Sequence, residues 1–146
     1  MAERTVFQSI SKRHVLSLGP QASVWDAACA MTRANCGSIL VMEPPDKLLG
    51  IVTERDLMTR VLAKALEPRQ TALSQIMTAQ PQCVPPETAV TDALVIMMER
   101  GFRHLPVVGP DRKILGVFSI RDALPLELGT AMSQTEFNEQ VNDALG

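Results

Sequence analysis

The chain carries one short pattern twice, at a constant offset of 66 positions. The first copy runs from Gly50 to Asp56, and the second runs from Gly116 to Asp122. The same offset matches identical residues without a gap over a long span, among them Pro20 with Pro86, Asp26 with Asp92, Met31 with Met97, Val41 with Val107, and Lys47 with Lys113. A unit of this length is too long for a common solenoid repeat. Because only two copies are present, we expect a pseudo-symmetric pair of halves packed face to face.

Each copy of the pattern reads as a buried strand that ends in a hydroxyl residue, Thr53 or Ser119. An arginine and an aspartate follow at the start of an expected helix. A helix N-terminus presents free backbone N–H groups and the positive end of a dipole, which suits an anionic ligand. The repeated pattern therefore predicts two related sites.

Composition narrows the class of protein. The 146 residues are 46% apolar and 3% aromatic, which suits one compact domain or two interlocked halves. The formal charge is −2 and the longest basic cluster is Lys12-Arg13-His14, which argues against a nucleic-acid surface. Three cysteines and two histidines show no metal-binding spacing. Without a signal-like or membrane-spanning apolar run, we expect a soluble cytoplasmic protein that does not contact a membrane.

Apolar periodicity predicts the order β-α-β-β-α twice, hence an α/β fold with small sheets flanked by helices. Helices are expected over 23–35, 54–66, 89–100 and 120–128, with Pro125 as a kink or boundary. Strands are expected over 38–42, 48–52, 105–108 and 114–118, with short ones at 15–18 and 83–84. The tail over 133–145 is a weakly amphipathic helix that packs on its own body or on a second subunit.

The doubled order, the stretch from Gly50 to Leu57, and the stretch from Gly101 to Val108 resemble a tandem pair of CBS domains, often called a Bateman module. The resemblance covers about residues 8–129. It implies one CBS repeat over 8–67 and a second over 74–129. A segment over 1–7 precedes them, and a tail helix over 130–146 follows.

The resemblance also implies a ligand, an adenosine compound such as AMP, ADP or ATP, held in the cleft between the repeats. S-adenosylmethionine is a further possibility, and no cofactor is required. Asp56 and Asp122 would hold the ribose, since a carboxylate accepts hydrogen bonds from both hydroxyls of a cis-diol. The hydroxyls would come from Thr53 and Ser119, and the phosphate contacts from Arg103, His104, Arg55 and Arg121. The adenine pocket would use His14, Val15, Leu16, Gly37, Ser38 and Ile39 for the Asp122 site, and Gln82, Cys83 and Val84 with Arg103 and His104 for the Asp56 site. Pro106 is a further residue expected in the adenine pocket.

The two copies differ where phosphate contacts are expected. The first has Gly37-Ser38 where the second has Arg103-His104, so only one copy carries a basic pair. We expect two inequivalent sites, with the Asp122 site the better one for a phosphorylated ligand. Structural readings compete with this one: each aspartate could complement the helix dipole, and the arginines could be solvated surface residues.

Three classes of function follow. The first is a regulatory module that senses an adenine nucleotide and signals to an unknown effector or to its mate in a homodimer formed through the repeat helices. An enzyme is disfavoured, because the chain has no nucleophile elbow, P-loop or dinucleotide fingerprint. The alternative is a structural dimerisation module without a ligand. Binding of an adenosine compound separates the first class from the last.

Overall fold

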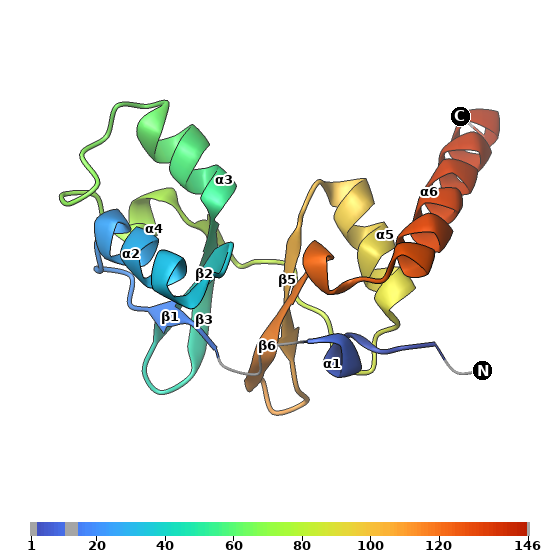
Figure 1. Ribbon diagram of the computed structural model, residues 1–146, viewed down its shortest axis with the longest axis horizontal. Helices are drawn as coiled ribbons and strands as arrows, with labels where there is room; N and C mark the ends of the chain where they lie inside the picture. Colours follow the sequence, from blue (N-terminus) through green and yellow to red (C-terminus); the bar gives the residue numbers. More distant parts are fainter. Residues whose placement is uncertain (1–2, 11–14, 146) are drawn as a thin grey trace. The chain divides into compact units, whose positions relative to one another are not determined.

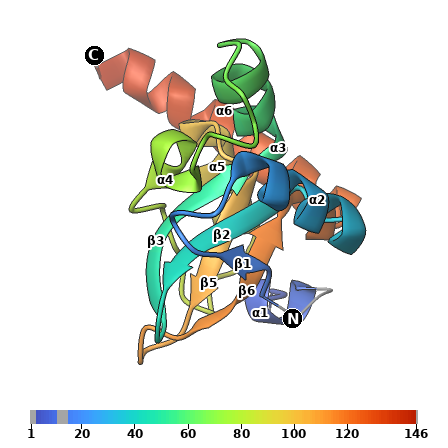
Figure 2. The same cartoon turned by 90° about the vertical axis from the view of Figure 1, so that its left-hand side faces the viewer.

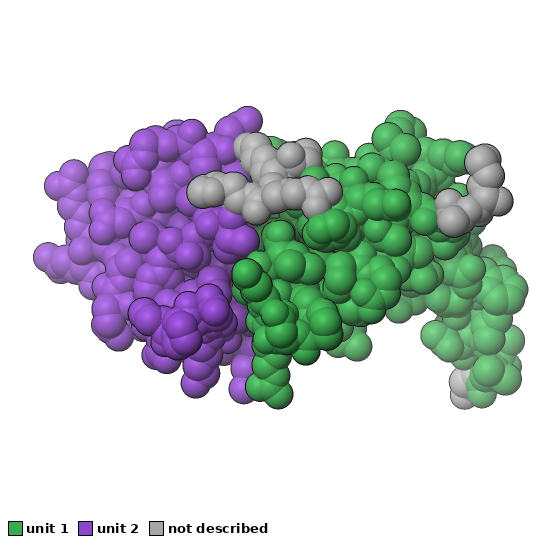
Figure 3. Space-filling model, turned by 90° about the horizontal axis from the view of Figure 1, so that it is seen from below, with its two compact units in different colours: residues 1–13, 82–146 green, residues 14–81 purple. Residues whose placement is uncertain are grey.

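The computed structural model describes residues 3–10 and 15–145, which form two compact units. Unit 1 comprises residues 1–13 and 82–146, and unit 2 comprises residues 14–81 (Figure 3). Each copy of the repeated pattern therefore lies in a unit of its own.

Unit 2 is built on a four-stranded sheet in the order β1-β2-β3-β4 (Figure 2). Its strands are β1 (Ser17–Leu18), β2 (Ser38–Glu43), β3 (Lys47–Thr53) and β4 (Thr78–Ala79). Strand β1 is parallel to β2, and the other two pairs are antiparallel. Its helices are α2 (Val24–Ala34), α3 (Glu54–Asp56), which continues as the π-helical turn η1 (Leu57–Leu62), and α4 (Leu73–Ile76). The core contains Val24, Ala27, Met31, Ile39, Val41, Val52, Val61, Leu73 and Ile76.

Gly50 on β3 allows the edge strand β4 to pair with this sheet. A side chain at Gly50 would place its Cβ 2.6 Å from the Met77 sulfur and 2.8 Å from the Thr78 carbonyl oxygen. Both distances are shorter than a real contact, so only glycine lets β4 pair with β3 at this position.

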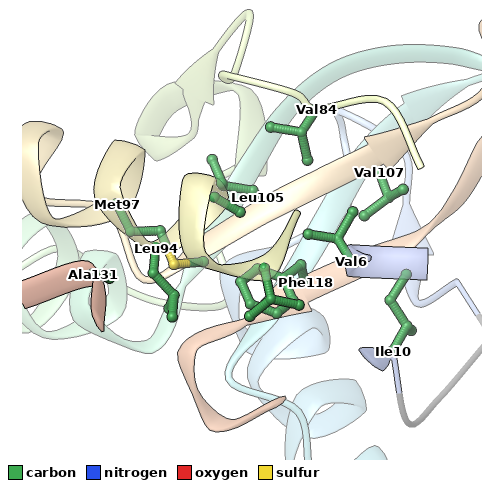
Figure 4. Packing of buried hydrophobic residues seen from close by; sticks show 11 residues of the cluster. Val6, Ile10, Val84, Leu94, Met97, Leu105, Val107, Phe118 and Ala131 are labelled. Atoms are coloured by element: carbon green, nitrogen blue, oxygen red, sulfur yellow. The ribbon is translucent and has the colours of Figure 1, made fainter. Parts of the chain in front are cut away.

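Unit 1 has the corresponding elements around a two-stranded sheet of β5 (His104–Val108) and β6 (Ile114–Ser119). A single parallel bridge from Val84 to Val107 replaces the short first strand. Its helices are α1 (Val6–Ser9), α5 (Val90–Arg100), the 3₁₀ turn η2 (Ile120–Asp122) and α6 (Pro125–Leu145), which runs along α5 (Figure 1). Figure 4 shows the core, which contains Val6, Ile10, Val84, Val90, Ala93, Leu94, Met97, Leu105, Val107, Phe118 and Ala131.

In each unit, the long helix before the hairpin ends at a residue with a left-handed backbone conformation. Helix α2 ends at Asn35 with φ 53°, and α5 ends at Gly101 with φ 76°. Both residues take the left-handed conformation that asparagine and glycine tolerate best. These two helices and the predicted strands agree with the structure to within one or two residues, except at 83–84, where only the bridge at Val84 forms.

The prediction of one helix over 120–128 is wrong, whereas the expected boundary at Pro125 is confirmed. The chain instead makes the three-residue turn η2, leaves the helical conformation at Ala123, and starts α6 at Pro125. Proline has no N–H to donate and disfavours the α conformation in the residue before it, but it fits the first position of a new helix. Helix α6 then continues to Leu145, across the expected boundary at residue 130.

The N-terminal segment over 4–10 is part of unit 1, where it packs against the start of α5. Its backbone bonds are Val6 N to Thr88 O at 2.8 Å and Val90 N to Arg4 O at 2.9 Å. In unit 2 the segment over 71–77 makes the same contacts, namely Leu73 N to Ala22 O at 2.9 Å and Val24 N to Thr71 O at 2.9 Å. The two segments are therefore structural counterparts at an offset of 67. Unit 1 takes this piece from the start of the chain, whereas unit 2 takes it from the residues after its own hairpin.

Candidate ligand sites at the ends of β3 and β6

The Thr/Ser-x-x-Asp pattern has nearly the same geometry in both units. The backbone N–H of Thr53 donates to Asp56 Oδ2 at 2.9 Å, and that of Ser119 donates to Asp122 Oδ2 at 2.9 Å. In return, Thr53 Oγ1 accepts from Asp56 N and Ser119 Oγ accepts from Arg121 N, both at 3.3 Å. These bonds hold each carboxylate at the end of its strand. One such bond uses only one of the roughly four acceptor positions of a carboxylate.

In unit 2, several predicted site residues lie at the end of the sheet where β2 begins and β3 ends. Ser38 is paired with Thr53 across the two strands, and the Gly37 carbonyl accepts from Glu54 N at 3.0 Å. The Leu16 carbonyl, just before β1, accepts from Leu40 N at 3.0 Å. Ser38 and Ile39 are buried, and Val15 and Leu16 are partly buried. The structure thus places five predicted site residues at one end of the unit 2 sheet, namely Leu16, Gly37, Ser38, Thr53 and Asp56.

In unit 1, the basic pair lies beside the second aspartate motif. His104 is paired with Ser119 across β5 and β6, and the Arg103 carbonyl accepts from Ile120 N at 3.1 Å. The Arg103 side chain is exposed and that of His104 is half-buried. Arg103, His104, Ser119 and Asp122 therefore share the end of this sheet.

The remaining predicted residues lie as follows. Val84 and Pro106 are buried beside one another, with Val84 N donating to Pro106 O at 2.9 Å. Gln82 and Cys83 are half-buried, and burial raises the pKa of the Cys83 thiol. Arg55 and Arg121 are exposed on the turns after β3 and β6. His14 lies outside the described residues. The grouping of these residues across the two repeats stays a prediction.

Arg60 is a feature of unit 2 that the sequence reasoning missed. Its Nε lies 3.6 Å from Asp56 Oδ1, and its Nη1 donates to the Ile76 and Met77 carbonyls at 3.0 and 3.3 Å. The Asp56 carboxylate is therefore shared with a cation of its own unit. The available signal was the spacing of aspartate and arginine four residues apart, which brings them to one face of a helix.

Arg4 is the corresponding feature of unit 1, and it was also missed. Its Nη2 donates to the backbone carbonyl of Asp122 at 2.8 Å and to Glu127 Oε1 at 2.8 Å, while Nε donates to Glu127 Oε2 at 3.2 Å. Glu127 Oε1 also accepts from Leu124 N at 2.8 Å. The hydrogen bond with Arg4 holds the pKa of Glu127 below its ordinary value, and the same bond raises the pKa of Arg4.

The described part of the chain has neither a metal-binding group nor a membrane-spanning helix. Over residues 3–10 and 15–145, no three His, Cys, Asp or Glu side chains gather as a metal-binding group. Within the same ranges, no helix combines the length and the apolarity needed to cross a bilayer.

Comparison with known proteins assigns the two units. The family model described as "CBS domain" matches twice, over residues 7–63 and over 73–128. The chain belongs to the CBS-domain family. Its tandem CBS pair and its α/β class, with small sheets flanked by helices, confirm two expectations from the sequence.

Individual relatives show how far the similarity extends. The meiotically up-regulated gene 70 protein of Schizosaccharomyces pombe is 34% identical over 139 residues, which is 89% of this chain but only 19% of that protein. A putative signal-transduction protein with CBS domains from Burkholderia ambifaria is 32% identical, with a TM-score of 0.76 over 82% of this chain and 90% of the other. A CBS domain protein of Pyrobaculum aerophilum, solved in complex with AMP, is 25% identical with a TM-score of 0.77, over 87% of this chain and 99% of the other.

Proposed function

We propose that this CBS pair is a regulatory module that binds an adenosine-containing ligand of the AMP, ADP or ATP class. The observation that carries the proposal is the matched pair of strand-end carboxylates, each fixed by a 2.9 Å bond from the backbone of its own motif. A carboxylate that is already oriented loses little freedom on binding, so its hydrogen bonds contribute more to affinity. Asp56 and Asp122 would accept from the two ribose hydroxyls, with Thr53 and Ser119 beside them.

The two sites would be unequal, and the Asp122 site would be the stronger. The resemblance implies Arg103 and His104 for the Asp56 site, but within unit 1 they stand at the start of β5 beside Ser119, so we assign them to the Asp122 site. A phosphorylated ligand would meet positive charge and N–H donors there. The Asp56 carboxylate is shared with Arg60, and the matching positions near it hold Gly37 and Ser38. S-adenosylmethionine has the ribose but no phosphate, so it would offer the basic pair only its single carboxylate charge.

Similarity supports the same function. The Pyrobaculum relative was solved with AMP, and CBS pairs of this kind are regulatory proteins rather than catalysts. A regulatory module needs an output, which here would be an unidentified effector or a second copy of the chain. Apolar side chains exposed on the helices could form a homodimer surface, among them Met58 and Leu62 on η1, and Leu126 and Met132 on α6. A dimerisation module without a ligand remains the alternative function.

Isothermal titration of the full chain with AMP, ATP and S-adenosylmethionine tests the proposal. Asp122→Asn is the sharpest variant, because asparagine still offers an oxygen to the Ser119 N–H while the charge is removed. We expect the phosphorylated ligands to bind the wild type, and Asp122→Asn to weaken them tenfold or more. An absence of heat and of thermal stabilisation with all three compounds would contradict the proposal and favour the dimerisation module.

A further inference from the structure

The backbone carbonyl of Asp122 accepts a hydrogen bond from a distant residue of unit 1. Turn η2 ends at Asp122, and the chain is extended at Ala123. A 3₁₀ helix would give the Asp122 carbonyl a partner three residues later, but that residue is Pro125, which has no N–H. The Arg4 guanidinium supplies the donor at 2.8 Å.

The same guanidinium fixes the start of the next helix. Arg4 contacts both carboxylate oxygens of Glu127, a two-pronged geometry that a planar fork of donors favours. Glu127 in turn accepts from the backbone of Leu124, the residue just before α6. The Arg4 and Glu127 side chains are 31% and 14% exposed, so water competes little for the glutamate. Arg4 thereby joins the end of the aspartate turn to the first turn of α6.

The position of Arg4 depends on the docked N-terminal segment. Its carbonyl accepts from Val90 N at 2.9 Å, and the next residue, Thr5, forms a bridge with Ala89. Val6, one residue further, is completely buried in the core of unit 1. If the segment leaves the body, the guanidinium leaves Asp122 with it.

We propose that Arg4 is a positioning residue of the Asp122 site, and that through it the orientation of the Asp122 carboxylate depends on docking of the segment over 4–10. This inference rests on the proposed function for its ligand. Arg4 acts through the backbone of Asp122 and through Glu127, and has no ligand contact of its own. Because coupling between two binding events is reciprocal, a ligand at Asp122 also strengthens docking of the N-terminal segment. Ligand binding at Asp122 thus changes how tightly the start of the chain is docked on unit 1.

Amide exchange and ligand titration on Arg4→Gln test the inference together. The Ser119 amide donates to Asp122 Oδ2, so its exchange rate in the ligand-free protein reports whether the carboxylate is in place. The Thr53 amide, which donates to Asp56 Oδ2, is the internal reference in unit 2. We expect Arg4→Gln to speed exchange at Ser119 at least fivefold with no change at Thr53, and to weaken AMP binding at least fivefold. Arg4→Lys should recover part of both losses, because the ammonium still donates to Glu127.

A core variant of the same unit provides the matched control. Leu94→Val, on α5, lowers the stability of unit 1 without changing a predicted site residue or Arg4, and should leave AMP affinity within twofold of the wild type. Unchanged exchange at Ser119 in Arg4→Gln would overturn the inference, as would an equal loss of AMP affinity in Leu94→Val. If the wild type binds no adenosine compound, the proposed function fails, but the exchange at Ser119 still decides whether Arg4 positions Asp122.

Discussion

In each unit, an arginine connects the turn that carries the site aspartate to a packed segment, which is residues 4–10 in unit 1 and 71–77 in unit 2. The arginine belongs to the packed segment in unit 1, but to the helix after the turn in unit 2. In unit 2, Arg60 extends from the helix after the turn to the carbonyls of Ile76 and Met77 at the end of the packed segment. In unit 1, Arg4 extends from the packed segment to the turn and to Glu127 on the helix that follows.

The difference determines whether the arginine contacts the carboxylate or the backbone carbonyl of the aspartate. Arg60 takes a carboxylate oxygen of Asp56, whereas Arg4 takes the backbone carbonyl of Asp122. Pro125 accounts for the change, since it breaks the helix after Asp122, while its counterpart Thr59 lets the helix continue. The repeats thus keep one geometry of the Thr/Ser-x-x-Asp turn while they place the neighbouring positive charge differently.

The largest predicted effect comes from the cores of the two units. Phe118 in unit 1 and its counterpart Val52 in unit 2 are both completely buried. Phe118→Ala should destabilise unit 1 by about 3–5 kcal/mol, and Val52→Ala should destabilise unit 2 by about 2 kcal/mol, because the smaller side chain leaves a smaller cavity. Native-state amide exchange measures the two units separately. Equal losses would show that the larger side chain is not well packed.

The second prediction tests whether the segments over 4–10 and 71–77 are equivalent. Val6 and Leu73 are completely buried at matching positions. Val6→Ala should cost about 2 kcal/mol and Leu73→Ala about 2–5 kcal/mol. Exchange should quicken at the Val90 amide in the first variant and at the Val24 amide in the second, since these amides donate to the two segments. Faster exchange at Val24 in Val6→Ala would contradict the assignment of each segment to its unit.

The third prediction uses the ion pair between Arg4 and Glu127 of unit 1. The pKa of Glu127 is lowered in the folded protein, chiefly by its bond from Arg4. Its contribution is therefore complete above its unfolded value of about 4.5 and is lost as pH falls through the lower folded pKa. We expect about 0.5–1 kcal/mol, since solvent screens the partly exposed Arg4.

Acid unfolding of the wild type and of Glu127→Gln measures this contribution. The variant should lose less stability than the wild type between about pH 5 and pH 3. Identical pH profiles would mean that the ion pair does not stabilise unit 1.

The smallest predicted effect lies at the start of the long helices. The Arg69 guanidinium carbon lies 4.6 Å from the centre of the Trp25 ring in unit 2, whereas the counterpart of Trp25 in unit 1, Thr91, donates to Glu3 at 3.4 Å. Arg69→Ala should cost about 0.5 kcal/mol, because the cation–π contact is exposed to solvent. Trp25 is the single tryptophan, so its fluorescence should change on this substitution. An unchanged spectrum would exclude the contact.

Much of the fold was accessible from the sequence because the 66-residue offset is free of gaps through the strands and the long helices. A local signal was also available at Ser23, since serine is a preferred N-cap residue and its hydroxyl caps α2. The π-helical turn after Asp56 could not be foreseen, because its residues have ordinary helical spacing. The break after Asp122 was visible in Pro125, but a kink and a new helix are equally compatible with one proline.

The candidate sites were only partly accessible. Thr53, Asp56, Ser119 and Asp122 were found because they repeat at a fixed offset. Arg4 was missed because its contacts lie 118 and 123 residues away along the chain. The segment that carries it follows an offset of 67 rather than 66, and apart from Gln8 and Gln75 it shares almost no side chains with its counterpart. Only folding reveals that residues 4–10 complete the second repeat.

The most direct test of the account compares AMP binding to Asp56→Asn and Asp122→Asn by isothermal titration. The account predicts that Asp122→Asn weakens binding at least tenfold, a loss of about 1.4 kcal/mol or more, while Asp56→Asn stays within threefold of the wild type. Both variants keep an oxygen for the backbone N–H of their motif, so neither should disturb its turn. A loss of binding in Asp56→Asn with normal binding in Asp122→Asn would contradict the account.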